Sequence, residues 1–408
     1  MATTNAFSAF DYFADFFVLC LVLVPIFYVL PWAWARRALL SLTGAYLLFL
    51  IAPRLLLFYI CFWVAIAILQ RIVAATGERK GGGYVLAVAI LATLAPLVIW
   101  KLWPADFTIW FNSSFDAGVF RISGYLGSID AFRAIILPIG LSFATFRAVD
   151  LLIQSHLGTV DGLAPDRVLF YGFFPPVQVI GPVIEYSEVG TQSGKTAKLN
   201  LDDYRAAFTQ VIVGAVKIFV LAVPLASSAD LFVVYRSNGA PTLWFELILY
   251  AWFFYLNFSG YSDLAIGTAR LFGYKLKPNF SRPFTRTNPQ AFWNSWHMSL
   301  TRFAMRNVFV PLGGMRRRSQ YVAIAATMMV IALWHDISLP LVIFGIYHTA
   351  GLIGARVLNE RRPAQADPSW QLKTLKAILL FLYVTASLPL LTLKFHDIGH
   401  FYGSLVGM

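Results

Sequence analysis

Two histidines, His297 and His335, are the side chains of this chain best suited to proton-transfer chemistry. Imidazole exchanges its proton near neutral pH and is a common general base. His335 ends an apolar run that starts at Tyr321. As a helix, that run rises about 1.5 Å per residue and carries His335 roughly 20 Å from its basic end. In a hydrocarbon core about 30 Å thick, such an imidazole needs a partner or a wet cavity. We therefore read His335 as a candidate base, with a purely structural role as the open alternative.

His297 lies in a stretch compatible with a helix, close to Trp293, Trp296 and Leu300. A histidine among tryptophans fits an interfacial or hydrogen-bonded core group as well as a functional one. Two histidines on adjoining membrane elements nevertheless predict a shared cavity. Polar side chains are rare at membrane depth, so those near the histidines are expected to bind substrate or line that cavity. They are Asn257, Ser259, Tyr261, Asp263, Trp293, Asn294, Trp296, Ser299, Trp334 and Asp336.

Metal and cofactor sites have no support in the sequence. No cysteine cluster is present, and Cys20 and Cys61 both lie within apolar runs. His335 and His348 are too far apart along the chain to form a helical ligand pair. Neither a nucleophile elbow nor a phosphate-binding loop is present. We expect no metal and no bound cofactor.

The elements that position these residues are membrane helices. The 408 residues are 59% hydrophobic and 13% charged, with mean hydropathy +0.68, whereas soluble proteins have about 25% charged residues. This composition predicts an all-α, polytopic membrane protein forming a single domain over residues 1–408. The net charge of +12 comes from basic residues in short loops. That pattern fits the positive-inside rule and a lipid bilayer partner, and it argues against nucleic-acid binding.

Hydropathy predicts about ten or eleven spans around a central cavity. The expected spans are 15–34, 38–53, 55–70, 84–103, 134–153, 207–233, 242–258, 320–335, 338–354 and 374–395. Basic loops place the N-terminus and the 105–131 loop outside the cytoplasm. The 168–183 run contains Pro175-Pro176 and predicts a re-entrant element rather than a span. We further expect a short amphipathic helix near 201–208 and an interfacial or half-inserted helix over 291–313.

Residues 137–351 resemble the membrane-bound O-acyltransferase (MBOAT) family. The resemblance rests on Phe-Trp-x-x-Trp-His-x-Ser-Leu at 292–300 and on Trp334-His335 one span later. Further matches are Leu137-Pro138-Ile139-Gly140-Leu141-Ser142-Phe143, Thr145-Phe146-Arg147, Phe173-Phe174-Pro175 and Gly181-Pro182. The resemblance implies the MBOAT fold, with His335 as the catalytic base and His297 as the second histidine.

The resemblance also implies a reaction. In it, an acyl group passes from a cytosolic thioester, on a phosphopantetheine carrier protein or acetyl-CoA, to a hydroxyl of a cell-envelope polymer or an extracytoplasmic acceptor protein. The setting would be the bacterial cytoplasmic membrane. Phe292-Trp293-Asn294 and the run 145–149 are most similar to D-alanyl transferases of teichoic acid. Pro311-Leu312-Gly313-Gly314 instead resembles the alginate and exopolysaccharide O-acetylases, which are the alternative.

Three positions depart from the family pattern. Asp336 stands where a glycine usually follows the catalytic histidine, Arg306-Asn307 replaces Arg-Asp, and Ala304 lies where an aromatic is common. A basic group on the predicted cytosolic side is a candidate for carrier docking, or simply for membrane orientation. It comprises Lys275, Lys277, Arg282 and Arg286. A membrane transporter is the alternative from another functional class, but paired interrupted helices are not evident.

Overall fold

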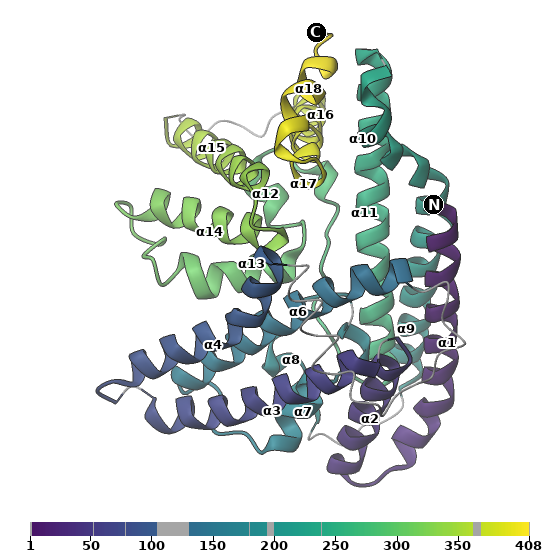
Figure 1. Ribbon diagram of the computed structural model, residues 1–408, viewed down its shortest axis with the longest axis vertical. Coiled ribbons are helices and arrows are strands. Elements are labelled where there is room, and N and C mark those ends of the chain that lie inside the picture. The colour runs from purple at the N-terminus through teal and green to yellow at the C-terminus, as the bar shows by residue number, and fades with distance from the viewer. Residues whose placement is uncertain are drawn as a thin grey trace. The chain divides into compact units, whose positions relative to one another are not determined.

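The computed structural model describes residues 2–51, 53–77, 79–103, 130–178, 180–193, 200–237, 239–361 and 369–407. Every regular element in these ranges is a helix (Figure 1). The predicted external loop 105–131 lies almost entirely outside the described residues. The chain forms two compact units. Unit 1 contains Met1–Ala215 and Tyr261–Lys277, and unit 2 contains Val216–Gly260 and Pro278–Met408.

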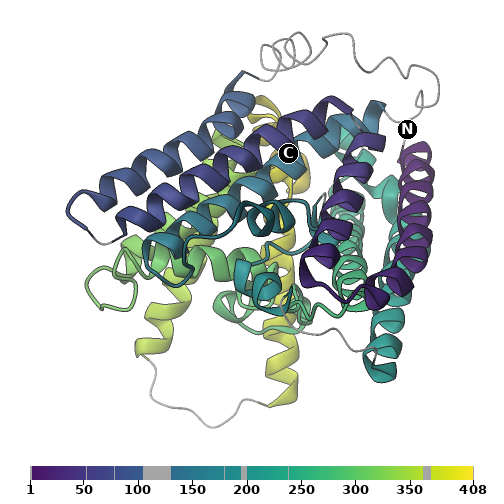
Figure 2. The ribbon, with the colours of Figure 1, turned by 90° about the horizontal axis from the view of Figure 1, so that it is seen from below.

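Unit 1 is built from the N-terminal helices. They are α1 (Ala2–Val29), α2 (Ala33–Ile51), α3 (Pro53–Thr76), α4 (Gly82–Leu102), α6 (Asp130–His156), α7 (Pro165–Gly172), α8 (Tyr186–Ser193) and α9 (Leu201–Ala215). The α3 and α4 helices run side by side and both pack against α6 (Figure 2). The hairpin expected from the runs 38–53 and 55–70 is present as α2 and α3, which also contact each other.

An arginine lies in the aromatic core of unit 1. Arg147 on α6 is 1% exposed, and its guanidinium carbon is 4.5 Å from the ring centre of Tyr171 and 5.4 Å from that of Trp63. Ring faces attract cations most strongly where water is excluded. The Thr145-Phe146-Arg147 motif therefore has a packing role in this unit, where it ties α6 to α3 and α7.

The break predicted in the 168–183 run is present. The α7 helix ends at Gly172, and Pro175–Val177 form a single 3₁₀ turn. The paired prolines remove two backbone donors, so an α-helix cannot continue through them. Farther on, Gly181 has φ 144, and a Cβ there would lie 2.9 Å from Ala265 Cβ. The non-helical backbone is therefore covered closely by protein, as backbone at membrane depth requires.

We expect Gly44→Ala to destabilise unit 1 strongly. A Cβ at Gly44 on α2 would lie 2.0 Å from the carbonyl oxygen of Phe173, an overlap that only backbone movement can relieve. Overpacking of this kind costs about 1–3 kcal/mol. Thermal unfolding of the purified protein should shift down by several degrees. Gly83→Ala is the matched control, because nothing lies within 4 Å of its Cβ. A wild-type melting temperature for Gly44→Ala would contradict this packing.

Unit 2 carries the remaining helices, except that the part of α11 beyond Gly260 belongs to unit 1. After the π-helix Val216–Ala222 and the 3₁₀ helix Val223–Asp230 come α10 (Leu231–Val234), α11 (Ala240–Leu271), α12 (Pro289–Trp293), α13 (Met298–Ala304), α14 (Gln320–His335), α15 (Leu339–Arg361), α16 (Trp370–Ser387), α17 (Pro389–Thr392) and α18 (Phe395–Leu405). The antiparallel α14 and α15 lie side by side (Figure 1).

Two elements are longer than the sequence predicts. The short amphipathic helix expected near 201–208 is the start of a continuous helical segment, which is apolar over Leu201–Ala226. The run 242–258 is only the first part of α11, which continues to Leu271. Gly260 and Gly267 lie within α11 without breaking it, and the chain turns only at Gly273, where φ is 80. A left-handed glycine just beyond the last turn is a common helix stop.

Five described helices are long and apolar enough to cross a membrane. They are Leu56–Thr76, Gly82–Leu102, Leu201–Ala226, Leu339–Glu360 and Trp370–Thr392. Phe16–Val29 and Gln320–His335 are shorter apolar helices of the same kind. Helices of this length and hydropathy characterise a multi-pass membrane protein.

Candidate active site

The first histidine lies at a break between two short helices. Asn288 begins α12 by accepting a hydrogen bond from Ala291 N at 2.8 Å, and α12 ends at Trp293. His297 then adopts a left-handed conformation, with φ 43 and ψ 52, immediately before α13. The prediction of one helix over 291–313 is therefore wrong, because the chain leaves the helical conformation between Trp293 and Met298. Backbone strain of this kind costs about 1–3 kcal/mol and persists only where the surroundings impose it.

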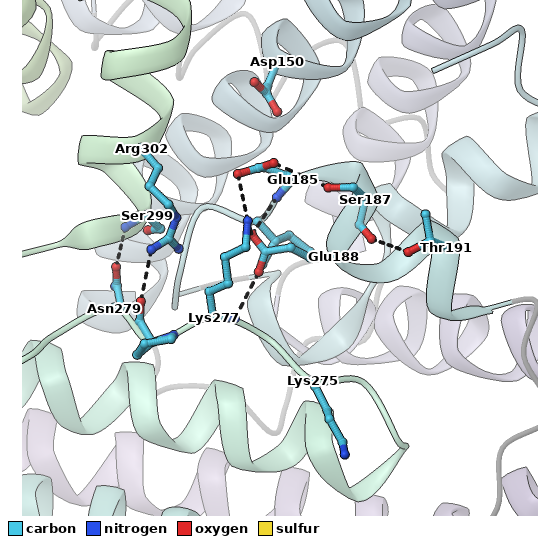
Figure 3. A network of polar contacts seen from close by, with 12 residues as sticks. Asp150, Glu185, Ser187, Glu188, Thr191, Lys275, Lys277, Asn279, Ser299 and Arg302 are labelled. Carbon is cyan, nitrogen blue, oxygen red and sulfur yellow. Dashed lines mark hydrogen bonds and ion pairs between the residues drawn. The ribbon is translucent and has the colours of Figure 1, made fainter. Parts of the chain in front are cut away.

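Asn279 imposes this conformation from the preceding loop. Its carbonyl oxygen accepts from Met298 N at 2.8 Å. Its side-chain oxygen accepts from Ser299 N at 3.1 Å (Figure 3). A third bond joins Ser281 N to Ser295 O at 2.9 Å. Asn279 is 1% exposed and satisfies the free amides at the start of α13, as a capping residue does. Nothing in the sequence singles out Asn279, because its partners are distant in the chain.

His335 is the last residue of α14 and is exposed, with the extended Asp336 directly after it. The enclosed position expected for His335 is therefore not observed. Because α14 ends at His335, the His335 side chain lies at the rim of a cavity. Trp334 links the two histidines: its ring centre is 4.7 Å from that of His335 and 5.6 Å from that of His297.

His297 and His335 line one cavity within unit 2, with a free volume of about 40 Å³. That space holds one or a few water molecules. Its walls are mostly aromatic or aliphatic: Ala251, Phe254, Phe258, Phe284, Phe292, Trp293, Trp296, Leu300, Ile331, Phe344, Val384, Leu388 and Leu391. The remaining lining residues are His297, His335, His348 and Ser387. The shared cavity predicted for the two histidines is therefore present.

The environment of His297 favours its neutral form. Its side chain is 3% exposed, and its ring centre is 4.7 Å from that of Phe258. Burial lowers the pKa of His297 well below its usual value, and the nearby His335 and Arg302 lower it further. A neutral imidazole offers one donor and one acceptor. His297 can thus orient a polar group beside His335 without carrying a charge of its own.

Several other predicted residues do not line this cavity. Asn257 and Ser259 lie on α11 in unit 2, whereas Tyr261 and Asp263 belong to the part of α11 in unit 1. Asp263 accepts a hydrogen bond from Gln210 at 3.3 Å. Only Trp293 and Trp296, of the ten polar and aromatic residues predicted around the histidines, line the cavity.

Three of the predicted residues have other places in unit 2. Asn294 is exposed, and its side-chain oxygen accepts from Gln290 at 3.3 Å. Ser299 is buried, and its backbone amide donates to Asn279. Asp336 is exposed at the end of α14.

The predicted basic group is divided between the units. Lys275 pairs with Asp203 at 2.8 Å. Lys277 lies 3.4 Å from Glu185 and 3.9 Å from Glu188 (Figure 3). These lysines therefore stabilise loops of unit 1. Arg286 in unit 2 donates to Ser281 O at 2.6 Å, and Arg282 is exposed.

His348 is a third histidine in the cavity and was not among the predicted site residues. It lies on α15, is 1% exposed, and contacts Ser387 Oγ through Nε2 at 3.0 Å. The sequence places it on an apolar segment, which reads equally well as core. Among the described residues, no three His, Cys, Asp or Glu side chains come together as a metal site would require.

Family comparison decides the identity of this arrangement. A profile of the MBOAT, membrane-bound O-acyltransferase family matches residues 163–387, more than half of the chain. The chain belongs to the membrane-bound O-acyltransferase family. The matched region contains all three cavity histidines and Ser387. It overlaps the span 137–351 over which the sequence motifs were recognised.

The similar proteins modify envelope polymers, according to their names. A probable alginate O-acetylase of Pseudomonas aeruginosa is 29% identical over 61% of this chain and 48% of its own length. A peptidoglycan O-acetyltransferase of Helicobacter pylori is 31% identical over 46% of this chain and 36% of its own length. A teichoic acid D-alanyltransferase of Streptococcus thermophilus is 26% identical over 72% of this chain and 80% of its own length. The chain spans about half the length of the alginate O-acetylases that it matches.

Proposed function

We propose that this protein is an O-acetyltransferase that moves an acetyl group from a thioester to a hydroxyl of a cell-envelope polymer. The observation that carries the proposal is the single cavity lined by His297 and His335 in a chain of the MBOAT family. The donor would approach from the cytosol and the acceptor from outside the bacterial cytoplasmic membrane. The N-terminus would then be extracytoplasmic, as the basic loops predict.

In the proposed reaction, His335 takes the proton of the acceptor hydroxyl as the oxygen attacks the thioester carbonyl carbon. The C–O bond forms and the C–S bond breaks. His335 then gives the proton to the leaving thiolate, which departs as a thiol. His335 lies at the C-terminal end of α14, where the helix dipole stabilises the positive charge that the imidazole acquires. Positioned base catalysis contributes about 10²–10⁴-fold. Neutral His297 orients the donor carbonyl across the same cavity.

The cavity favours acetyl over D-alanyl. A D-alanyl thioester carries an ammonium group, which is costly to remove from water without a compensating charge. None of the residues that line the cavity is acidic. This observation favours acetyl, which the sequence left as the alternative acyl group, over D-alanyl, whose transferases the sequence motifs resemble most. An acetyl group needs only the apolar and neutral polar walls that are present.

The test is to express the protein in a bacterial strain that lacks its own envelope O-acyltransferases. Membranes are then supplied with radiolabelled acetyl-CoA or with D-alanyl carrier protein. We expect acetate, released from the purified envelope polymer by mild alkali, to carry the label. If the polymer carries D-alanine instead, the transferred group is D-alanyl rather than acetyl, but the reaction is still an O-acyl transfer. Solute movement in vesicles without any acylation would instead support a transporter.

Charge reversal at Arg282 and Arg286 tests how the donor arrives. Acyl-carrier proteins are acidic and CoA carries phosphates, so a basic docking surface attracts either one. The Arg282→Glu, Arg286→Glu variant should raise the KM for acetyl-CoA about tenfold at low salt and lose most of its salt dependence. The matched control is Arg79→Glu, Lys80→Glu, two exposed cations in the turn before α4. If the KM and its salt dependence are unchanged, the two arginines contribute only to membrane orientation and not to donor docking.

A further inference from the structure

In the cavity of unit 2, two neighbouring side chains each bury a polar atom that has no hydrogen-bond partner in the structure. The two atoms are the Nδ1 atom of His348 and the indole Nε1 of Trp293. His348 is 1% exposed and Trp293 is 9% exposed. Buried polar groups are nearly always hydrogen-bonded, and each exception calls for a reason. Two such atoms on the wall of one cavity point to a ligand that supplies their missing hydrogen bonds.

The hydrogen bonds of Ser387 fix the tautomer of His348. Ser387 Oγ donates its single proton to Val384 O at 2.7 Å. It therefore accepts in its 3.0 Å contact with His348 Nε2, which must carry the proton. In the neutral imidazole, the other nitrogen is then an acceptor. His348 Nδ1 thus presents a lone pair, whereas the indole Nε1 of Trp293 presents a proton.

The two side chains are neighbours. Their ring centres are 5.1 Å apart, the rings are nearly perpendicular, and both residues line the cavity. Phe344 and Tyr383 flank His348 at ring distances of 4.4 and 5.5 Å and hold the imidazole in place. The site therefore offers one donor and one acceptor among aromatic side chains.

We propose that Trp293 and His348 form a subsite for a neutral substrate group that both accepts and donates a hydrogen bond. The proposal rests on the acyl transfer proposed above and assigns these residues a positioning role. A carboxylate only accepts and an ammonium only donates, so neither satisfies both atoms. A secondary amide and a hydroxyl each satisfy both. The thioester arm of CoA or phosphopantetheine carries such an amide near its sulfur, and a polysaccharide acceptor carries such hydroxyls.

The test uses three variants in lipid nanodiscs. Trp293→Phe removes the indole proton and keeps an aromatic ring. His348→Gln keeps a group that can reach Ser387 but loses the acceptor at the Nδ1 position, whereas His348→Asn keeps an acceptor there and loses the Ser387 contact. We expect Trp293→Phe and His348→Gln to raise one KM about tenfold, while His348→Asn stays within about threefold of wild type. Tyr402→Phe is the matched control, because it removes a 2.7 Å bond to Ala386 O on α16 outside the cavity.

The affected substrate identifies the group. A raised KM for acetyl-CoA, with the polymer KM unchanged, assigns the subsite to the amide of the donor arm. A raised KM for the purified polymer assigns it to an acceptor hydroxyl. Calorimetric titration with CoA, with no acceptor present, separates this proposal from the proposed function. If the wild-type protein transfers no acyl group but binds CoA about tenfold more tightly than Trp293→Phe, the proposed subsite is supported and the proposed acyl transfer is refuted.

Three results would overturn the subsite. If His348→Gln restores wild-type behaviour and His348→Asn does not, the bond between His348 and Ser387 merely holds α15 to α16. The subsite is likewise wrong if all three variants keep wild-type KM values and wild-type CoA affinity. A fall in kcat that tracks a fall in melting temperature, with both KM values unchanged, has the same consequence.

Discussion

Replacing His335 with alanine is expected to reduce acyl transfer by about 10²–10⁴-fold while leaving the protein folded. The substitution removes the proposed proton acceptor, and the other histidines that line the cavity are buried. His335 itself is exposed at the end of α14, so its loss should change stability by less than about 0.5 kcal/mol. The measurement is label transfer from acetyl-CoA to the polymer, together with thermal unfolding of the same samples.

His396→Ala is the matched control for His335→Ala. His396 also lies on a helix of unit 2, and its imidazole is 72% exposed and 3.1 Å from Asp397. It is absent from the cavity lining, so its loss should leave turnover near the wild-type value. Substantial turnover by His335→Ala, with His396→Ala unchanged, would move the proposed base to His297 or His348.

The helical fold could be predicted because each membrane helix is recognisable from its own run of apolar residues. Apolar runs and basic loops predicted α4 and α14 with ends close to those observed, and they predicted the start of α15, which continues to Arg361. Proline pairs likewise marked the break after α7. The length of α11 was not predictable from hydropathy, because polar residues such as Asn257 and Asp263 continue a helix whose apolar run has ended. Only the left-handed Gly273 stops it.

The candidate site was predictable in part. The two histidines and their tryptophans follow from residue type and spacing, and the structure brings His297, His335, Trp293 and Trp296 to one cavity. The roles of Asn279 and His348 depend on contacts between distant segments, namely Asn279 with Ser299 and His348 with Ser387. No periodicity in a single sequence reports such contacts. The exposure of His335 depends likewise on where α14 ends against its neighbours.

Variants at His297 should separate the imidazole from the backbone that carries it. Asparagine and glycine adopt the left-handed conformation readily, whereas alanine does so at a cost of about 1–2 kcal/mol. We expect His297→Asn and His297→Gly to lose at least about tenfold in acyl transfer because neither can orient the donor carbonyl as imidazole does. His297→Ala should be equally inactive and should also melt at the lowest temperature of the three. Each variant is assayed for label transfer and thermal unfolding under identical conditions.

The order of the three variants decides between two explanations of any loss at His297. If the imidazole matters, turnover falls to a similar level in all three, although their melting temperatures differ. If His297 serves only to connect α12 to α13, activity should follow stability, so that the asparagine and glycine variants remain active and only alanine fails. The bonds from Asn279 to Met298 and Ser299 do not involve the His297 side chain, so the cap of α13 persists in every variant. Near-wild-type turnover by His297→Asn would therefore assign His297 a structural role and leave the orientation of the donor to Trp293 and His348.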